Sequence, residues 1–324
     1  MKTKEKIVIT GAAGFIGSHL CDYFVSHNYE VVGLDNFATG FSHNISHLES
    51  APNFTFVEGD IRNLETCKQL IAGASYVLHQ AALGSVPRSI ADPITTNEVN
   101  VTGFLNVLVA AQEAGVKKVV YAASSSTYGD AVQLPKVEDV VGKPLSPYAI
   151  TKYVNELYAD VFFKTYGLNS IGLRYFNVFG PRQDATGGYA AVIPKFIKNL
   201  IQQATVTVNG DGSHSRDFTY IENVVQANVK ALFADAARAN NTVYNVACGD
   251  RTTLNQLLET LTALLVKHGI PANKATTVHG PLRPGDVPHS QASIQKATAL
   301  LGYVPEYNAK QGLEKSVLWY INNL

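Results

Sequence analysis

The sequence contains few cysteines, no long apolar run and no excess of either charge. Cys21, Cys67 and Cys248 are too few and too scattered for a disulfide framework or a paired-cysteine metal site. No apolar run approaches the roughly 20 residues that a membrane span requires. The 26 basic and 26 acidic side chains cancel, so there is no positive surplus for binding nucleic-acid phosphates. We therefore expect a cytoplasmic, enzyme-sized protein with no membrane or nucleic-acid partner.

Strand and helix patterns alternate through the first half of the chain. Apolar, β-branched runs predict strands over 7–10, 31–35, 54–57, 76–79 and 119–122, with helices over 15–26, 63–73 and 98–115 between them. Continuous apolar strands separated by helices are typical of a parallel sheet buried on both faces. Right-handed crossovers then give a doubly wound, Rossmann-type α/β fold.

Beyond about residue 175 the pattern becomes irregular and rich in turns. Glycine and proline cluster at 180–181, 187–188, 209–212 and 283–286, and helices are predicted near 190–203, 221–237, 253–267 and 310–322. We expect a dinucleotide-binding domain over 1–175, with a return segment at about 217–247. Residues 176–216 and 248–324 are predicted to form a smaller C-terminal substrate-binding lobe.

A glycine-containing turn joins the first predicted strand to the first helix. Gly11, Gly14 and Gly17 permit a tight turn and a close backbone approach, so that a pyrophosphate can lie on the helix N-terminus. Asp35 ends the second strand, where an acid would accept hydrogen bonds from the adenosine ribose hydroxyls. Because residues 36–40 contain no arginine to pair with a 2′-phosphate, the pattern favours NAD over NADP.

Tyr148 and Lys152 have the i, i+4 spacing that places both side chains on one helix face. A tyrosine has a pKa of about 10, and a neighbouring ammonium and a cationic nicotinamide would lower that pKa. Ser124 ends the fifth predicted strand, at the sheet edge that faces the ligand crevice. Each feature alone also fits a half-buried tyrosine beside a solvated lysine, or an ordinary serine turn.

Together, these elements resemble the extended short-chain dehydrogenase/reductase family, and within it the UDP-hexose 4-epimerases. The motifs that carry the resemblance are TGAAGFIG, SSSTYGD, SPYAITKYVNE, LRYFNVFGPRQ, NGDGSHSRDFTYI and RPGDVPHSQAS, which together span nearly the whole chain. The GSVPRS segment at 84–89, and the Arg-Gln pair after Gly180-Pro181, look like the bacterial branch that acts on N-acetylated UDP-hexosamines for surface polysaccharides.

The resemblance implies a role for each matching residue. Tyr148 is expected to be the acid/base, Lys152 its partner, and Ser124 the hydroxyl that binds the sugar O4. The residues expected to bind NAD are Gly11, Gly14, Phe15, Ile16, Gly17, Asp35, Asn36, Gly40, Asp60, Ile61, Gln80, Ala82, Asn100, Tyr148, Lys152 and Tyr175. Those expected to bind the UDP-sugar are Ser85, Ser124, Ser125, Ser126, Asn177, Ala191, Val192, Val208, Arg216, Arg283, Asp286 and Ser290.

The resemblance also bears on the reaction. Related dehydratases and decarboxylases carry acids after the position of Ser124, and here those positions are Ser125 and Ser126. Ser290 stands where family members that admit an acetamido group have a small residue. We therefore expect interconversion of UDP-GlcNAc and UDP-GalNAc through a 4-keto sugar. UDP-N-acetylglucosaminuronate and UDP-glucose/UDP-galactose remain alternative substrates, with Ser85, Arg88 or one of the serines available to meet a carboxylate.

Three further expectations complete the sequence-based prediction. The helices near 94–115 and 146–168 match a pair that forms a dimer interface in the family, so a homodimer is expected. His43 and His47 have i, i+4 spacing but no evident third ligand, so we predict no metal site. A regulator that only binds NAD is the competing class, and such proteins usually lose the tyrosine or the lysine.

Overall fold

The computed structural model describes residues 5–185, 191–281 and 287–324, and its centre is one parallel sheet. The sheet has seven strands in the order β11-β6-β5-β4-β1-β2-β3, all paired in parallel. Their bounds are β1 Lys6–Thr10, β2 Glu30–Asp35, β3 Phe54–Glu58, β4 Tyr76–His79, β5 Lys118–Ser124, β6 Ser170–Tyr175 and β11 Thr242–Val246. The strand order reverses between β1 and β4, so a crevice is expected at the carboxyl ends of these two strands.

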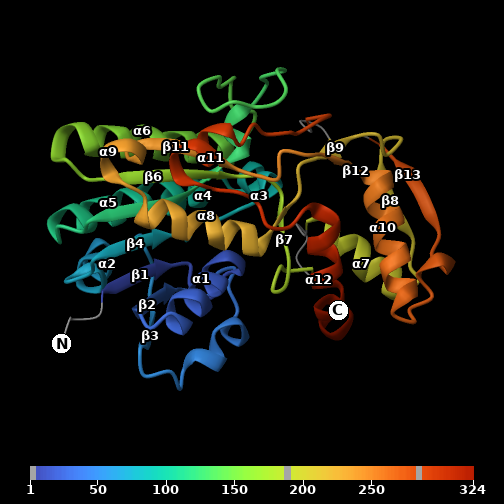
Figure 1. Cartoon of the computed structure of the whole chain (residues 1–324), viewed down its shortest axis with the longest axis horizontal. Coiled ribbons are helices and arrows are strands. Elements are labelled where there is room, and N and C mark those ends of the chain that lie inside the picture. The colour runs from blue at the N-terminus through green and yellow to red at the C-terminus, as the bar shows by residue number, and fades with distance from the viewer. Residues whose placement is uncertain (1–4, 186–190, 282–286) are drawn as a thin grey trace.

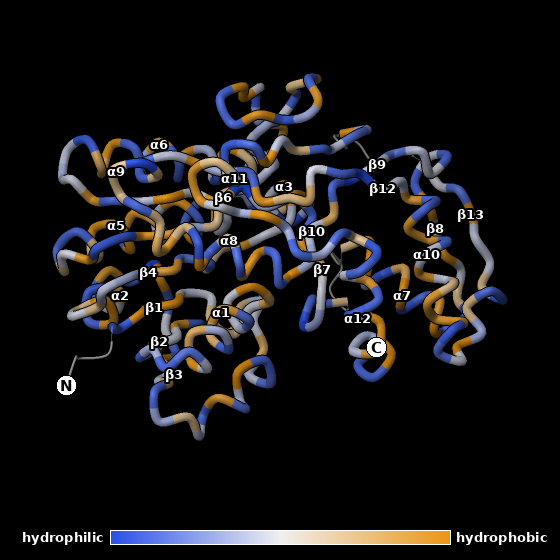
Figure 2. The backbone as a smooth tube through the Cα atoms, in the orientation of Figure 1, coloured by the Kyte–Doolittle hydropathy of each residue, from blue (hydrophilic) through white to orange (hydrophobic). Residues whose placement is uncertain are grey.

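Helices cover both faces of this sheet (Figure 1). On one face α1 (Phe15–Ser26) packs against α8 (Ile221–Phe233). On the other, α5 (Gly103–Glu113) lies between α2 (Leu64–Ile71) and α6 (Pro147–Tyr166). Two buried apolar clusters result, one around Phe24 and one around Phe104. The apolar stretches run along the central strands, whereas the outer loops are hydrophilic (Figure 2), which confirms the predicted doubly wound α/β class.

The remaining elements form a loop-rich region on the right of Figure 1. Three short strand pairs lie outside the main sheet: β10 with β7, β12 with β9, and β13 with β8. The strands are β7 Val178–Phe179, β8 Val206–Asn209, β9 Ser215–Arg216, β10 Thr219–Tyr220, β12 Thr252–Thr253 and β13 Thr277–Gly280. The helices of this region are α7 Val192–Ile201, α10 Leu254–Lys267 and α12 Ala309–Asn323, whereas α11 (Gln295–Leu301) packs against β11 and α8 of the main sheet (Figure 1). The division of the chain into two domains stays a prediction.

Two predicted helices differ in detail from the observed ones. The helix expected over 98–115 starts as a π-helical turn at Glu98–Thr102 before α5 begins. The helix expected over 221–237 ends at Phe233 and is followed by the separate short α9 (Ala236–Ala239). The buried Lys118 explains this break, because its ammonium donates to the carbonyl oxygens of Ala231 (3.2 Å) and Ala234 (2.6 Å).

Three short helices matter for the site described below. They are α3 (Val86–Ala91), α4 (Pro93–Asn97) and the 3-10 helix η4 (Ser125–Tyr128), which directly follows β5. None of the helices in the described part of the chain combines the length and the apolar composition that crossing a membrane demands. Among the described residues, no three metal-ligating side chains come together as a metal site.

Candidate active site

The turn between β1 and α1 requires glycine at two positions. Gly11 has φ +71°, and a Cβ there would lie 2.7 Å from the backbone nitrogen of Ala81. At Gly17 a Cβ would lie 2.0 Å from the Gly11 carbonyl oxygen. No side chain caps the N-terminus of α1, so its first N–H groups remain available for an anion. This geometry fits a dinucleotide pyrophosphate, as predicted from the glycine spacing.

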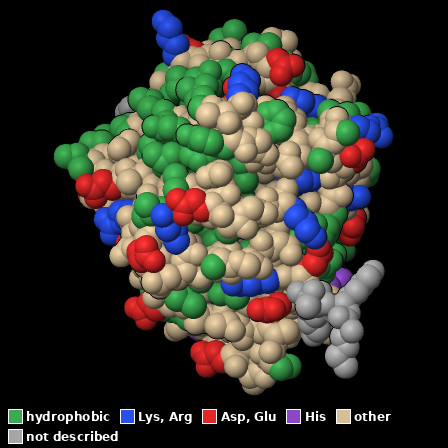
Figure 3. Space-filling view, turned by 90° about the vertical axis from the view of Figure 1, so that its left-hand side faces the viewer, with side chains coloured by type: hydrophobic (Ala, Val, Ile, Leu, Met, Phe, Trp, Pro, Cys, Tyr) green, Lys and Arg blue, Asp and Glu red, His purple; other side chains and the backbone are tan. Residues whose placement is uncertain are grey.

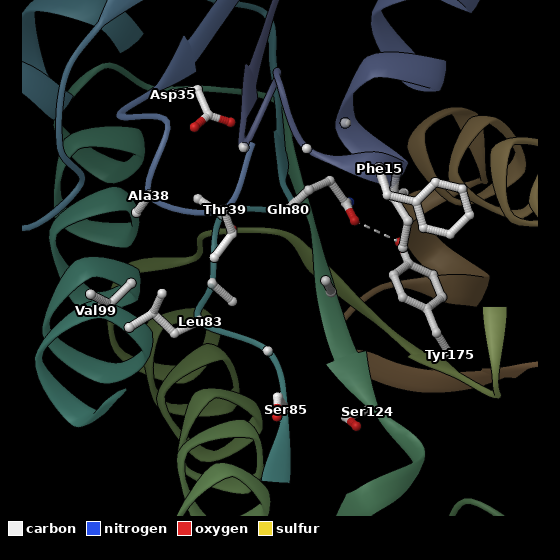
Figure 4. Close-up of a pocket in the computed structure, with 18 of the residues that line it drawn as sticks. Phe15, Asp35, Ala38, Thr39, Gln80, Leu83, Ser85, Val99, Ser124 and Tyr175 are labelled. Carbon is white, nitrogen blue, oxygen red and sulfur yellow. Dashed lines mark hydrogen bonds between the residues drawn. The ribbon is translucent and has the colours of Figure 1, made fainter. Parts of the chain in front are cut away.

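A cavity of about 520 Å³ opens at the carboxyl ends of β1, β2 and β4 (Figure 4). Its lining includes most residues predicted to bind the cofactor: Gly11, Gly14, Phe15, Ile16, Gly17, Asp35, Asn36, Asp60, Ile61, Gln80, Ala82, Tyr148, Lys152 and Tyr175. Ser85, Ser124, Asn177 and Ala191 from the predicted substrate set also line it. Lining residues outside those predictions include Ala38, Thr39, Leu83, Arg88, Val99, Gln183 and Asp184. The apolar residues in this last group carry no chemical signal in the sequence.

Asp35 lies at one end of this cavity, and Ser85 and Ser124 lie at the other (Figure 4). The Asp35 carboxylate accepts hydrogen bonds from the backbone N–H groups of Ala13 (2.9 Å) and Phe37 (2.8 Å). Burial raises the pKa of Asp35, and these amide donors oppose that rise. A carboxylate at this position can also accept hydrogen bonds from ribose hydroxyls. An acid held in this way favours NAD, because it would repel a 2′-phosphate.

Asp60 is the second acid at the adenosine end. It accepts a hydrogen bond from the Asn36 amide (3.0 Å) and forms an ion pair with Arg62 (2.7 Å). This ion pair lowers the pKa of Asp60, so the carboxylate stays charged. Arg62 lies within reach of Glu98 as well (3.4 Å).

Two residues predicted to bind the cofactor, Asn100 and Gly40, lie behind the cavity wall. Asn100 is buried and bonds the backbone N–H and carbonyl of Leu83, at 2.7 and 3.1 Å, which fixes the wall after β4. A Cβ at Gly40 would lie 3.0 Å from the Asp35 carboxylate, so glycine allows this loop to approach Asp35. In the described residues neither Asn100 nor Gly40 lines the cavity.

Tyr148 and Lys152 project from the first turns of α6. Ser146 caps this helix by accepting from the Ala149 N–H (3.1 Å), and Pro147 occupies its first position. The Lys152 ammonium is buried and donates to the carbonyl oxygen of Ala122 (2.8 Å). Burial lowers the pKa of Lys152 to about 8. It also raises the pKa of Tyr148, and a hydrogen bond with Ser124 opposes that rise.

Three consecutive serines stand at the end of β5, and their surroundings differ. Ser124 lines the cavity, whereas Ser125 and Ser126 do not appear among the described lining residues. Both the backbone N–H and the hydroxyl of Ser126 donate to the Ser124 oxygen, at 3.1 and 2.8 Å. Direct contact of Ser125 or Ser126 with substrate therefore stays a prediction.

A second cavity of about 230 Å³ adjoins the first, and the two share Asn177, Val178, Gln183 and Ala191. Arg216 and Val192 line it together with Phe196, Phe218 and Asn209. The Arg216 guanidinium donates to the carbonyl oxygens of Ser215 (2.9 Å) and Pro288 (3.1 Å). An arginine on the wall of a cavity that aromatic side chains also line suits a nucleoside diphosphate.

Other predicted substrate residues lie around this second cavity. Val208 is fully buried in the core, while its neighbours Thr207 and Asn209 line the cavity, so only its backbone can face a ligand. The Ser290 N–H donates to the carbonyl oxygen of Ser215 (3.0 Å), which places Ser290 beside Arg216. Arg283 and Asp286 lie outside the described residues.

The sequence-based prediction did not include two buried charged groups near the site. Arg174 pairs with Glu156 of α6 through two hydrogen bonds (2.9 and 2.7 Å), and its guanidinium lies over the Tyr128 ring (4.8 Å). Arg174 thereby ties α6 to the turn that follows Ser124. Glu156 continues the i, i+4 series of Tyr148 and Lys152. This spacing is the feature of the sequence that could have identified Glu156 as a residue on the same helix face.

The second missed group is Asp217, which follows Arg216. Its carboxylate is fully buried and accepts from the backbone N–H groups of Cys248 (2.9 Å), Gly249 (3.1 Å) and Ala292 (3.2 Å). Asp217 thus joins three segments around the second cavity, a role that sequence adjacency to Arg216 does not reveal.

Comparison with known proteins agrees with this site. The profile of the "NAD dependent epimerase/dehydratase family" matches residues 7–247, about three quarters of the chain. The UDP-glucose 4-epimerase of Mycolicibacterium smegmatis is 35% identical over 319 residues, covering 98% of this chain and 99% of that protein.

Two solved structures are similarly close. The UDP-N-acetylglucosamine 4-epimerase of Methanobrevibacter ruminantium, in complex with UDP-N-acetylmuramic acid, superposes with a TM-score of 0.91 at 35% identity, covering 99% of this chain and 100% of that chain. The UDP-glucuronic acid 4-epimerase of Bacillus cereus, in complex with UDP-glucuronic acid and NAD, has a TM-score of 0.89 at 31% identity, covering 98% and 100%. These three relatives act on three different sugars.

Proposed function

The chain belongs to the NAD dependent epimerase/dehydratase family, and we propose that it is a UDP-N-acetylglucosamine 4-epimerase. The observation that carries this proposal is the placement of Tyr148, Lys152 and Ser124 in a cavity continuous with that of Arg216. A UDP-sugar whose diphosphate is held at Arg216 would direct its hexose through the shared lining toward Tyr148.

The residues at this junction support proton transfer at the sugar O4. Tyr148 takes the O4 proton as the C4–O4 bond becomes a carbonyl, and Ser124 holds the oxygen. NAD held along Gly11, Asp35 and Lys152 would supply a reversible hydride acceptor for C4, so the reaction would involve no net redox change. The 4-keto sugar rotates about its diphosphate linkage before Tyr148 returns the proton. Lys152 supplies a positive charge on the same helix face, which favours the phenolate.

The residues after Ser124 argue against dehydration. Expelling a C6 hydroxyl needs a proton donor next to Ser124, and Ser125 and Ser126 carry only hydroxyl groups. Epimerisation requires no further acid.

Ser290 supports the N-acetylated sugar. Its backbone bond to Ser215 anchors it beside Arg216, and a serine leaves space that a tyrosine would fill. The Methanobrevibacter relative is named for UDP-N-acetylglucosamine, which agrees with this choice.

The deciding experiment is NMR of the purified protein with UDP-GlcNAc, UDP-N-acetylglucosaminuronate and UDP-glucose in separate tubes, without and with added NAD. A new galacto-configured anomeric signal that forms fastest from UDP-GlcNAc supports the proposal. Conversion of UDP-glucose alone would refute the Ser290 argument. Silence in all tubes after NAD is added would refute epimerisation.

Two variants sharpen this experiment. Ser290→Tyr should suppress turnover of UDP-GlcNAc but spare UDP-glucose, whereas the matched Ser290→Ala should spare both. Tyr148→Phe should reduce turnover by about 10²- to 10⁴-fold. If Tyr148→Phe keeps the full biological activity of the protein, the NAD-binding regulator becomes the better explanation.

UDP-N-acetylglucosaminuronate is the second candidate substrate. Arg88 of α3 lines the first cavity next to Ser85, so a cation stands on the wall of the proposed sugar site. Such a cation would favour a C6 carboxylate. Faster conversion of the uronate in the NMR experiment would move the assignment to this acid.

The proposal includes a homodimer that forms through α6. Ile150, Leu157 and Val161 lie on one stripe of α6 and are each about half exposed, and Ile90 and Ile94 from the adjacent α3 and α4 are more exposed still. Figure 3 views the molecule from the left-hand side of Figure 1, and hydrophobic side chains gather over the upper part of that face. Exposed apolar patches of this kind mark protein–protein contacts, and a second copy would cover this one.

A cytoplasmic location, and a product that supplies surface-polysaccharide synthesis, are proposed on the resemblance to the bacterial branch. This placement is part of the same proposal.

A further inference from the structure

Three polar side chains from elements far apart in the chain meet at the wall of the cofactor cavity. Gln80 directly follows β4, Tyr175 ends β6, and Asn228 lies in α8. Gln80 and Tyr175 line the cavity, whereas Asn228 is fully buried and is not among the described lining residues. Figure 4 shows the hydrogen bond that joins Gln80 to Tyr175. The sequence-based prediction did not include Asn228.

A backbone carbonyl determines the orientation of the Asn228 amide. One end of this amide lies 2.8 Å from the carbonyl oxygen of Val224, one helical turn earlier in α8. A carbonyl oxygen can only accept, so this end of the amide must be the nitrogen Nδ2. The second proton of Nδ2 is donated to the Tyr175 hydroxyl (2.9 Å). The oxygen of Asn228, Oδ1, therefore faces Gln80.

The Asn228 oxygen in turn determines the orientation of the Gln80 amide. The Gln80 atom that lies 3.2 Å from Asn228 Oδ1 must be a donor, so it is the nitrogen Nε2. The Gln80 oxygen, Oε1, then lies 3.1 Å from the Tyr175 hydroxyl, which is also 3.1 Å from Asn228 Oδ1. Burial raises the pKa of Tyr175, so its hydroxyl keeps the proton that it donates to these oxygens. The second N–H of Gln80 takes no part in these bonds and is left to a ligand in the cavity.

The place of Gln80 in the cavity indicates which part of a dinucleotide it meets. The Gln80 backbone lies against the glycine turn, because a Cβ at Gly11 would come within 2.9 Å of the Gln80 carbonyl carbon. Gln80 also lies between Asp35, at the adenosine end, and Ser124 (Figure 4). The pyrophosphate and the ribose in the middle of NAD present oxygen atoms, and an amide N–H can donate to such oxygens.

We propose that Asn228 is a positioning residue that orients the Gln80 amide so that its N–H, and not its oxygen, faces the pyrophosphate and ribose of NAD. With the Gln80 amide reversed, the oxygens of Gln80 and Asn228 would face each other, and the cavity would present an acceptor to an anion. Asn228 acts through Gln80 and does not itself contact the cofactor. The inference concerns the NAD site and holds whichever UDP-sugar is the substrate.

The test measures the affinity of NAD and ADP-ribose by isothermal titration calorimetry, on purified protein from which any bound NAD has been removed. Asn228→Leu keeps the approximate shape of the side chain but removes the oxygen that holds Gln80. It should weaken the binding of both ligands by about 3- to 10-fold, the equivalent of one hydrogen bond. Adenosine, which lacks the pyrophosphate and the second ribose, should bind wild type and variant equally in an NMR titration.

Further variants connect the effect to Gln80. Gln80→Met removes the amide and should weaken NAD binding as much as Asn228→Leu does. In the Gln80→Met background, Asn228→Leu should cause no further loss, because the amide that Asn228 orients is gone. Asn223→Leu is the matched control, since Asn223 is also a fully buried asparagine of α8, and its amide bonds the backbone of Glu306 and Tyr307. It should lower the stability of the protein and leave the NAD affinity unchanged.

Asn228→Ser replaces Asn228→Leu if the leucine variant does not fold. A serine hydroxyl can restore the hydrogen bond to the Val224 carbonyl within the helix. It is too short to reach Gln80, so the same loss of NAD affinity is expected.

A wild-type NAD affinity in the Asn228 variant would overturn the proposal, as would additive losses in the double variant or an equal loss in Asn223→Leu. Weaker binding of adenosine would also overturn it, because the damage would then extend beyond Gln80. The same holds if NAD binding weakens while ADP-ribose binding does not, since Gln80 would then meet the nicotinamide ring. If the affinities change as expected but no UDP-sugar is converted, the proposed function fails and the role of Asn228 stands.

Discussion

Replacing Asp217 by asparagine should change how the stability of the protein depends on pH. The Asp217 carboxylate is fully buried, and its hydrogen bonds come from backbone amides. Burial raises its pKa from 3.8 to about 7, and the amide donors only partly oppose this rise. The folded protein therefore holds a proton that the unfolded chain releases.

The sign of the effect follows from these two pKa values. Below pH 3.8 the side chain is protonated in both states and contributes no penalty. As the pH rises from 3.8 to the folded value of about 7, the unfolded chain ionises while the folded carboxyl stays protonated, so stability is lost over this range and levels off above it. Between pH 5 and 8.5 the loss is about 3 kcal/mol.

Other titratable groups near Asp217 do not imitate this behaviour. Burial raises the pKa of the Cys248 thiol to about 12 and that of Tyr303 well above its ordinary value, so both stay neutral. Asp250 is exposed. All three are present in both proteins, so their contributions cancel when wild type and variant are compared.

The assay is urea unfolding followed by circular dichroism at several pH values between 5 and 8.5. The free energy of unfolding of the wild type, minus that of Asp217→Asn, should fall by about 3 kcal/mol across this range. A constant offset between the two proteins reports only the altered hydrogen bonds. A difference that stays level with pH would refute the buried, protonated carboxylate.

Three further predictions concern the turn, the lysine and the dimer. Gly17→Ala should lower the melting temperature of the cofactor-free protein strongly, because its Cβ would lie 2.0 Å from a carbonyl oxygen. Gly14→Ala, with one contact at 3.1 Å, should have little effect, and equal shifts would contradict the argument. Because burial lowers the pKa of Lys152 to about 8, epimerase activity should fall as the pH rises through that value and the ammonium is lost. Lys152→Met should abolish this limb, which a pH profile of kcat/KM will reveal. Leu157→Asp on α6 should yield monomers in sedimentation velocity, whereas Leu318→Asp, equally exposed on α12, should not; a dimer that survives Leu157→Asp would exclude this face.

Much of the fold follows from local patterns in the sequence. The strand at 76–79 and the helix at 15–26 coincide with β4 and α1, because buried strands and amphipathic helices have distinct periods. The glycine turn, Asp35 and the Tyr148/Lys152 pair were predictable for a related reason. Each is defined by residue type and spacing within one short segment.

Tertiary structure decided what depends on segments far apart in the chain. Asn100 braces the backbone of Leu83 from behind the cavity wall, and its predicted contact with the cofactor stays a prediction. The alternation of β8 turns Val208 into the core and leaves Thr207 and Asn209 facing the second cavity. Such outcomes follow from packing, which local spacing does not encode.

Glu156 and Asp217 also show the difference between what the sequence predicts and what tertiary structure decides. Nothing in the sequence marks Glu156, within the helix expected near 146–168, or Asp217, next to Arg216, as buried. Folding surrounds Glu156 with Arg174 and Asp217 with three backbone amides. The sequence by itself determined which groups could do chemistry at the end of the sheet. Only the packed chain determined which of them are buried, and the hydrogen bonds that the buried groups make connect the elements around the site.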